Sequence, residues 1–195
     1  AGSDPRELRF RPVPEALAEY PHVAVDLVAG SGAVRPDSHW QWEDSARLVG
    51  YASREPARVA IATPANYLMT CTLTPSSDAR LTCMIRTRAG VTWETTAAPE
   101  PVPARSACEG YELSLAENHA ELRGKYFRSG REIALPFARP ISLTLLVQGT
   151  ILECFVDDAF AFSCRAYNYR QGDLVLELTR GKVSIDRLSV RTHDQ

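Results

Sequence analysis

The sequence lacks any run of 18 apolar residues, and its first residues hold no apolar stretch of the kind found in signal peptides. We therefore expect a soluble chain without a membrane-spanning helix or a signal peptide. It also lacks a basic stripe, because Lys and Arg are scattered and the net charge is −2. No footprint for neutralising phosphates exists, so nucleic acid and membrane are not expected as partners.

Cysteine is scarce and irregularly placed. The five thiols are Cys71, Cys83, Cys108, Cys154 and Cys164, without a C-x-x-C motif and without histidines at ligand spacing. We therefore expect no metal site, no cofactor and no complete disulfide framework, and the odd count favours a reducing compartment such as the cytoplasm. Two pairs, 71 with 83 and 154 with 164, flank turns symmetrically and are expected to be cross-strand neighbours, favoured as buried reduced thiols over disulfides.

Helical periodicity is almost missing, since only residues 14–20 suit a helix of one or two turns. From residue 23 onward, short alternating apolar runs are bounded by Gly, Pro, Asn and Asp. Ten or more such strands in 195 residues predict one all-β domain, a two-sheet antiparallel β-sandwich with a short N-terminal helical connector. A barrel is the alternative. The proline-rich stretch 95–109 is predicted to be a loop.

The spacing of the strands predicts a meander of short pairs. Residues 67–74 and 80–87 are expected to form one hairpin, and residues 110–115 and 120–123 another. In the last third, strands are expected at 141–147, 151–156 and 161–165, followed by three separate strands at 173–178, 182–185 and 186–191.

Two segments resemble a known family. Residues 8–17, L-R-F-R-P-V-P-E-A-L, resemble the connector by which family 32 glycoside hydrolases leave their catalytic propeller, and residues 151–158 with 162–167 resemble a hairpin of their C-terminal module. The resemblance implies a concanavalin-like or laminin-G-like sandwich at residues 21–195, with residues 1–20 connecting it to an upstream propeller that is its partner. The parent protein would then be a fructan- or sucrose-active hydrolase.

The catalytic motifs of that family have no counterpart except the dipeptide Glu153-Cys154, which lies in a predicted hairpin strand and is interpreted as coincidence. Retaining hydrolysis needs a second carboxylate about 5 Å away. We therefore expect no enzyme activity from this chain alone. A few residues, Arg86 and Gly110-Tyr111, are also similar to carbohydrate-binding module family 66, which implies a fructan ligand.

Candidate sugar-binding residues combine aromatic rings with charged or polar groups, because a flat ring covers the C–H face of a sugar while polar groups bind its hydroxyls. They are Trp40, Trp42, Glu43, Arg86, Arg88, Trp93, Tyr111, Glu112, Tyr167 and Asn168. The alternatives are a core or interdomain tryptophan pair, a solvated sheet face and, for the last two, an interface with the propeller. Asp157 and Asp158 are predicted to be turn residues, with a calcium site as the alternative.

Three functions remain open at this point. The first is an accessory module that supports a fructan- or sucrose-active propeller and contributes to carbohydrate binding. The second is a free-standing carbohydrate-binding module for fructan or another fructose-containing sugar. The third is an interaction or dimerisation domain without affinity for sugars.

Overall fold

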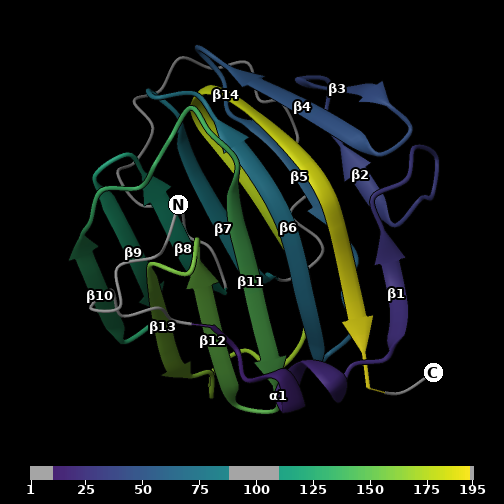
Figure 1. Cartoon of the computed structure of the whole chain (residues 1–195), viewed down its shortest axis with the longest axis vertical. Helices are drawn as coiled ribbons and strands as arrows, with labels where there is room; N and C mark the ends of the chain where they lie inside the picture. Colours follow the sequence, from purple (N-terminus) through teal and green to yellow (C-terminus); the bar gives the residue numbers. More distant parts are fainter. Residues whose placement is uncertain (1–10, 88–109, 194–195) are drawn as a thin grey trace, which may run out of the picture.

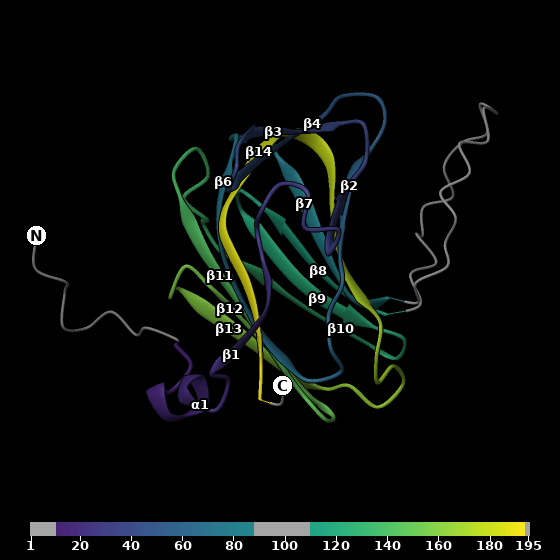
Figure 2. The ribbon, with the colours of Figure 1, turned by 90° about the vertical axis from the view of Figure 1, so that its right-hand side faces the viewer.

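The computed structural model describes residues 11–87 and 110–193, and it consists of two packed antiparallel β-layers with one short helix, α1 (Pro14–Ala18) (Figures 1 and 2). The predicted all-β sandwich with a short N-terminal helix is confirmed. Sheet A holds β1 (His22–Asp26), β3 (Trp40–Asp44), β4 (Arg47–Ala52), β6 (Tyr67–Pro75), β11 (Ile141–Gln148), β12 (Ile151–Val156) and β13 (Phe160–Arg165). Sheet B holds β2 (Val34–Pro36), β5 (Ala57–Ile61), β7 (Arg80–Thr87), β8 (Tyr111–Ala116), β9 (His119–Gly124) and β10 (Phe127–Glu132).

The last strand, β14 (Asp173–Thr192), belongs to both sheets. Its first half pairs with β5 and β7, and its second half pairs with β4, β1 and β6, so it passes over the top of the sandwich in Figure 2. The prediction of three separate strands here is wrong. Gly181 adopts φ +82° beside the Ser76 hydroxyl, where a Cβ would lie 2.6 Å from Oγ, so the glycine signals a bend rather than a turn.

The predicted hairpin of residues 67–74 and 80–87 is also wrong, because β6 lies in sheet A and β7 in sheet B. Cys71 and Cys83 therefore come from opposite layers and are not cross-strand neighbours. Cys154 and Cys164 lie on paired strands but out of register, with Cys164 opposite Leu152. The four cysteines in the described residues are free thiols, and Cys108 lies outside them.

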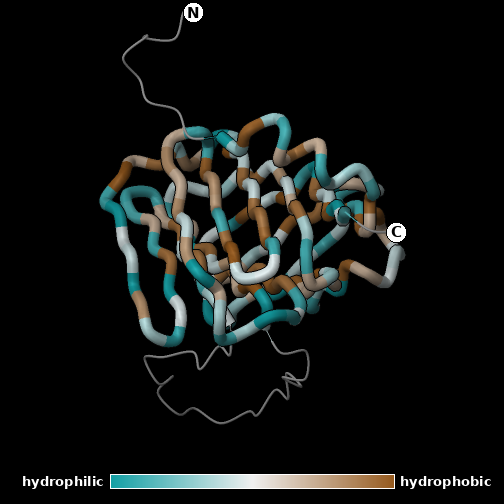
Figure 3. Tube along the Cα trace, turned by 90° about the horizontal axis from the view of Figure 1, so that it is seen from below, coloured by the Kyte–Doolittle hydropathy of each residue, from teal (hydrophilic) through white to brown (hydrophobic). Residues whose placement is uncertain are grey.

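The other predicted pairings are confirmed, since β8 pairs with β9 and β11–β12–β13 form a meander. One large core fills the space between the layers, and alternate residues of nearly every strand enter it, as Leu81, Cys83 and Ile85 do in β7. Figure 3 shows the corresponding alternation of apolar and polar segments along the chain. The polar alternate positions are therefore displayed on the two outer faces.

The N-terminal segment packs on the outer face of sheet A. Tyr20, which is 1% exposed, contacts Leu68 of β6 and Leu146 of β11, and Leu17 of α1 covers the same cluster. Arg11 forms an ion pair of 2.5 Å with Asp158 in the β12–β13 turn. Figure 2 shows α1 beside this layer. Among the described residues, no helix is long and apolar enough to cross a membrane.

Candidate functional site

A row of polar side chains crosses the outer face of sheet B, with one residue on each of five neighbouring strands. The strand registers place these residues opposite one another in sequence, and residues directly opposite in antiparallel strands share a face. The row, here called the polar row, consists of Arg58 (β5), Glu177 (β14), Thr82 (β7), Ser114 (β8) and Glu121 (β9).

Glu121 forms one end of the polar row, and its side chain is only 3% exposed. The Nε atoms of Arg123 and Arg128 both donate to its carboxylate, and His119 Nε2 lies 3.7 Å from it. Burial raises the pKa of Glu121, but the hydrogen bonds and charges of the two arginines lower it by a larger amount. The pKa therefore lies below its ordinary value. The carboxylate is therefore ionised and held in one orientation at neutral pH.

Gly130 of β10 is the direct cross-strand partner of Glu121. A Cβ at this glycine would lie 3.3 Å from the His119 ring and 3.6 Å from a Glu121 carboxylate oxygen. The first contact is tight and the second is an ordinary van der Waals contact, so a side chain here would press on the histidine beside the carboxylate.

The rest of the polar row contains a second ion pair and two hydroxyls. Arg58 Nε donates to Glu177 Oε2 over 2.5 Å, and Glu177 is 8% exposed. The Oγ1 of Thr82 and the Oγ of Ser114 are 3.3 Å apart, midway between the two ion clusters. At about 4.8 Å per strand, the distance from Arg58 to Glu121 is roughly 19 Å, long enough for an extended chain of several hydroxylated rings.

The two carboxylates of the polar row are unsuited to glycoside hydrolysis as a pair. They are three strands apart, which at about 4.8 Å per strand is roughly 14 Å. Retaining and inverting glycosidases use carboxylates about 5 to 9.5 Å apart. The arrangement is suited to binding hydroxyls, since carboxylates accept their hydrogen bonds, guanidinium groups donate, and hydroxyls do both.

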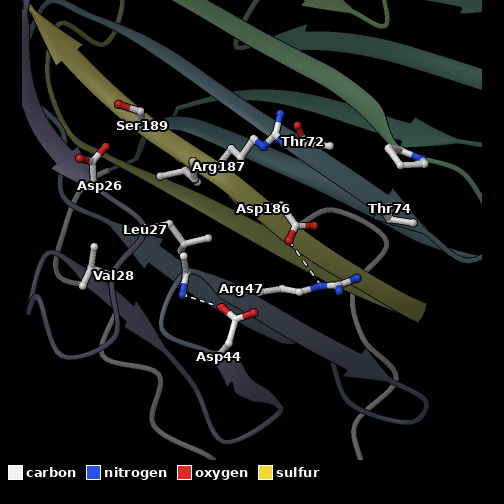
Figure 4. A pocket seen from close by; sticks show the side chains of 13 residues that line it. Asp26, Leu27, Val28, Asp44, Arg47, Thr72, Thr74, Asp186, Arg187 and Ser189 are labelled. Atoms are coloured by element: carbon white, nitrogen blue, oxygen red, sulfur yellow. Dashed lines mark hydrogen bonds and ion pairs between the residues drawn. The ribbon is translucent and has the colours of Figure 1, made fainter.

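A groove with a volume of about 860 Å³ lies on the opposite side of the molecule, on the outer face of sheet A (Figure 4). Its floor contains Thr72 and Thr74 of β6, and its walls come from β14 and from the segments around β1 and β4. Arg47 crosses it toward Asp186, with Nε 3.4 Å from the carboxylate. The lining combines charged side chains and hydroxyls with apolar carbon, so it is suited to a hydroxylated ligand.

The predicted tryptophan pair lies on one face of β3, but that face points inward. Trp40 is 5% exposed and belongs to the core, and Trp42 is half-buried against it. The Trp40 ring covers Gly50, its cross-strand partner on β4. Trp40 thus presents no ring face to a sugar, which corrects the expectation for this residue. Glu43 is exposed and forms an ion pair with Arg47.

Arg86 is neither on a solvated face nor open to a ligand, because it is 1% exposed. It has φ +56°, and its guanidinium donates to the carbonyls of Ala65, Gly149 and Tyr169 at 2.8–3.0 Å. These carbonyls belong to three separate loops, so the side chain ties them together. Burial lowers the pKa of Arg86. The expected sugar contact is corrected to a structural role.

Tyr111 is also buried, at 1% exposure. Its ring stacks on Phe127 and meets Tyr169 edge-on, while its hydroxyl accepts a hydrogen bond from the backbone N–H of Asn168. Tyr167 is 64% exposed, and Asn168 is exposed as well. The structure therefore separates this group into a buried ring and two surface side chains.

Glu112 is half-buried and lies on β8 two residues from Ser114, so it adjoins the polar row. Arg88 and Trp93 lie outside the described residues. Asp157 and Asp158 have φ +50° and +55° in the β12–β13 turn, which confirms their prediction as turn residues. Within 11–87 and 110–193, no cluster of three metal-ligating side chains occurs.

Sequence reasoning missed the polar row almost entirely. Glu121 and Glu177 are acids flanked by apolar residues, which is the local signal of an outward position on a half-buried strand. The signal identifies the face but not the neighbours. The path of β14 through both sheets determines which five strands lie side by side.

Comparison with known proteins shows the fold. No model of a protein family matches the sequence, and no curated protein matches it. Among solved structures, carbohydrate-binding module CBM66 from Bacillus subtilis is similar with a TM-score of 0.59 and 9% identity, over 82% of this chain and 96% of that one. A Bacillus subtilis protein of unknown function with a galectin-like fold has a TM-score of 0.60 and 11% identity, over 88% and 96%.

The exoplasmic/lumenal domain of VIP36, in a Ca²⁺- and Man2-bound form, has a TM-score of 0.59 and 11% identity, over 89% of this chain and 88% of that one. Sequence identities this low show a shared fold and do not identify a ligand. The chain thus has the galectin-like β-sandwich fold of these structures.

Proposed function

We propose that this chain is a non-catalytic carbohydrate-binding domain and that the polar row on sheet B binds a neutral oligosaccharide. One observation carries the proposal: two nearly buried carboxylates, Glu121 and Glu177, are each held by arginine on the outer face of sheet B, with two partly exposed hydroxyls between them. The similarity of the fold to domains described as carbohydrate-binding supports it.

The charged groups of the polar row are preorganised. A sugar hydroxyl exchanges its hydrogen bonds with water for bonds to the protein, so binding gains only when the protein groups are already oriented. Glu121 and Glu177 are oriented by their arginines before any ligand arrives. Burial of ion pairs costs desolvation, which offsets part of the stability that they add, so a role in recognition accounts for the arrangement better than a role in folding alone.

We further propose that the sugar is a fructan and that the domain accompanies the catalytic propeller of a fructan- or sucrose-active hydrolase. The resemblance of residues 8–17 to a propeller connector supports this. So does the packing of Tyr20 and Leu17 on sheet A, because a connector fixed to the sandwich would hold an upstream domain in a defined orientation. A free-standing module would bind fructan without such a partner.

A domain that serves protein interaction alone differs from both in having no affinity for sugars. Mixing the chain with a separately expressed family 32 propeller tests the accessory role. Association measured by analytical ultracentrifugation supports it, and two independent species refute it.

Isothermal titration calorimetry of the full chain with levan, inulin and mannose oligosaccharides tests sugar binding. In the variant T82V/S114A both central hydroxyls are removed while the ion pairs stay. Each lost hydrogen bond is worth about 1 kcal/mol, so affinity is expected to fall roughly 10-fold or more.

The matched control is T144V, on the outer face of sheet A, where Thr144 lies opposite Thr70 and Phe155. It should bind like the wild type. Absence of binding by the wild type, or equal affinity of wild type and T82V/S114A, would refute the polar row as a sugar site.

A further inference from the structure

The groove on sheet A exists because two strands share one edge of β14. Strand β4 pairs with β14 up to Asp186, and β1 pairs with it from Ser189 onward. Between these points neither strand pairs with β14, and only Leu27, just beyond β1, donates its backbone N–H to the Leu188 carbonyl. The side chains of β6 form the floor of the groove (Figure 4). The groove is therefore part of the fold and not a gap between loops.

A β-bulge in β14 lies in this stretch between the two paired strands. Asp186 pairs with Thr72 and Ser189 with Thr70, so β14 has one more residue than β6 over the same distance. Arg187 takes up the difference with φ +53°, a conformation that L-residues other than Asn and Asp rarely adopt. As a result Arg187 is exposed over the groove, while Leu188 is 2% exposed and enters the core.

The charged side chains around the groove differ in whether they have an interaction partner. Arg47 is held by Asp186 and by Glu43, at 3.4 and 3.1 Å. The side chains of Arg187 and Asp26 have no hydrogen-bond or ion-pair partner within the described part of the chain, and both line the groove. One donor and one acceptor of opposite charge are thus available to a ligand.

The chemistry of the lining restricts the ligand. An anion would meet the carboxylates of Asp26, Asp44 and Asp186, and a cation would meet two arginines. A neutral polyol satisfies both signs, because each hydroxyl can donate to a carboxylate and accept from a guanidinium. Val28, which is 48% exposed, adds an apolar surface at the rim for C–H groups.

We propose that this groove is a second saccharide-binding site, in which Arg187 donates to and Asp26 accepts from hydroxyls of a neutral sugar. Its volume of about 860 Å³ lies within the roughly 300–1,000 Å³ typical of small-molecule sites. With the polar row on the other sheet, the chain would have two sugar sites facing opposite directions. Such a chain can cross-link polysaccharide strands or gain avidity on one of them.

Amide chemical-shift mapping by NMR tests the proposal on the full chain, with levan, inulin and mannose oligosaccharides as probes. With at least one probe, we expect shifts at Asp26, Thr72 and Ser189. R187A should weaken binding at these residues at least 10-fold, and R191A, which removes an exposed arginine of the same strand outside the groove, should not. Shifts at Ser114 and Glu121 report the polar row separately, so either site can fail alone.

A second variant tests whether the positive φ of Arg187 strains the backbone. Because glycine accepts φ +53° without cost, R187G should raise the melting temperature and also abolish binding in the groove. Together these results support an arginine that serves binding at the expense of stability. The proposal is overturned if no probe shifts the groove amides, if R187A binds like the wild type, or if R187G lowers the melting temperature.

Discussion

Replacing Arg86 by Met removes the group that ties three loops together at one end of the sandwich. Its guanidinium donates to the carbonyls of Ala65, Gly149 and Tyr169 at 3.0, 2.8 and 3.0 Å. A hydrogen bond to a charged group contributes about 1.5–3 kcal/mol. Part of this loss in free energy is offset, because the desolvated cation is removed together with its hydrogen bonds. Ala65 and Gly149 are also exposed enough for their carbonyls to be rehydrated.

We therefore expect R86M to lower the free energy of unfolding by about 3 kcal/mol. At about 2–4 °C per kcal/mol for a domain of this size, the melting temperature should fall by roughly 6–12 °C. Urea unfolding followed by tryptophan fluorescence and circular dichroism measures the change. R86K, which keeps the charge without the planar fork, should lose about half as much. If R86M unfolds within about 0.5 kcal/mol of the wild type, the argument that Arg86 is a structural tie is refuted.

Three further outcomes follow from single contacts. G50A should destabilise by about 1–3 kcal/mol in urea unfolding, because its Cβ would lie 2.8 Å from the Trp40 ring; an unchanged midpoint would contradict the packing. The pKa of Glu121 is lowered in the fold, so its contribution to stability is complete above the ordinary value of 4.5 and is lost as the pH falls through the lower folded value. Unfolding at pH 7, 5 and 3 should show this decline in the wild type and a weaker one in E121Q, and parallel curves would count against it. Burial raises the pKa of Cys164 to about 11, so its reaction with a thiol reagent at pH 8 should be about 100-fold slower than that of an ordinary thiol, and equal rates would show that the thiol is not desolvated.

The strands and the fold class were predictable because burial on one face of a pleated strand leaves a two-residue period in the sequence. In β7, the apolar Leu81 and Cys83 flank the polar Thr82, and both the strand and its inward face follow from that alternation. The partner of β7 did not follow, since a turn between two strands fits a hairpin as well as a connection between layers. The bend at Gly181 was likewise ambiguous, because a glycine fits a turn or a strand crossing from one sheet to the other.

The binding residues were less predictable than the fold. Trp40 and Trp42 share a face, but their spacing does not say whether that face is the inner one. Arg86 and Arg187 have positive φ in irregular parts of their strands, where alternation fails, so pattern reasoning assigned the first to the surface and passed over the second. Glu121 depends on strand neighbours, which only the long-range pairing of the sheet determines.

The polar row is tested most directly by a crystal structure of the chain grown or soaked with an oligosaccharide that binds in calorimetry. The account predicts sugar density across sheet B, with hydroxyls within hydrogen-bond distance of Thr82 Oγ1, Ser114 Oγ and the Glu121 carboxylate. A sugar bound elsewhere with this face left to solvent would contradict it.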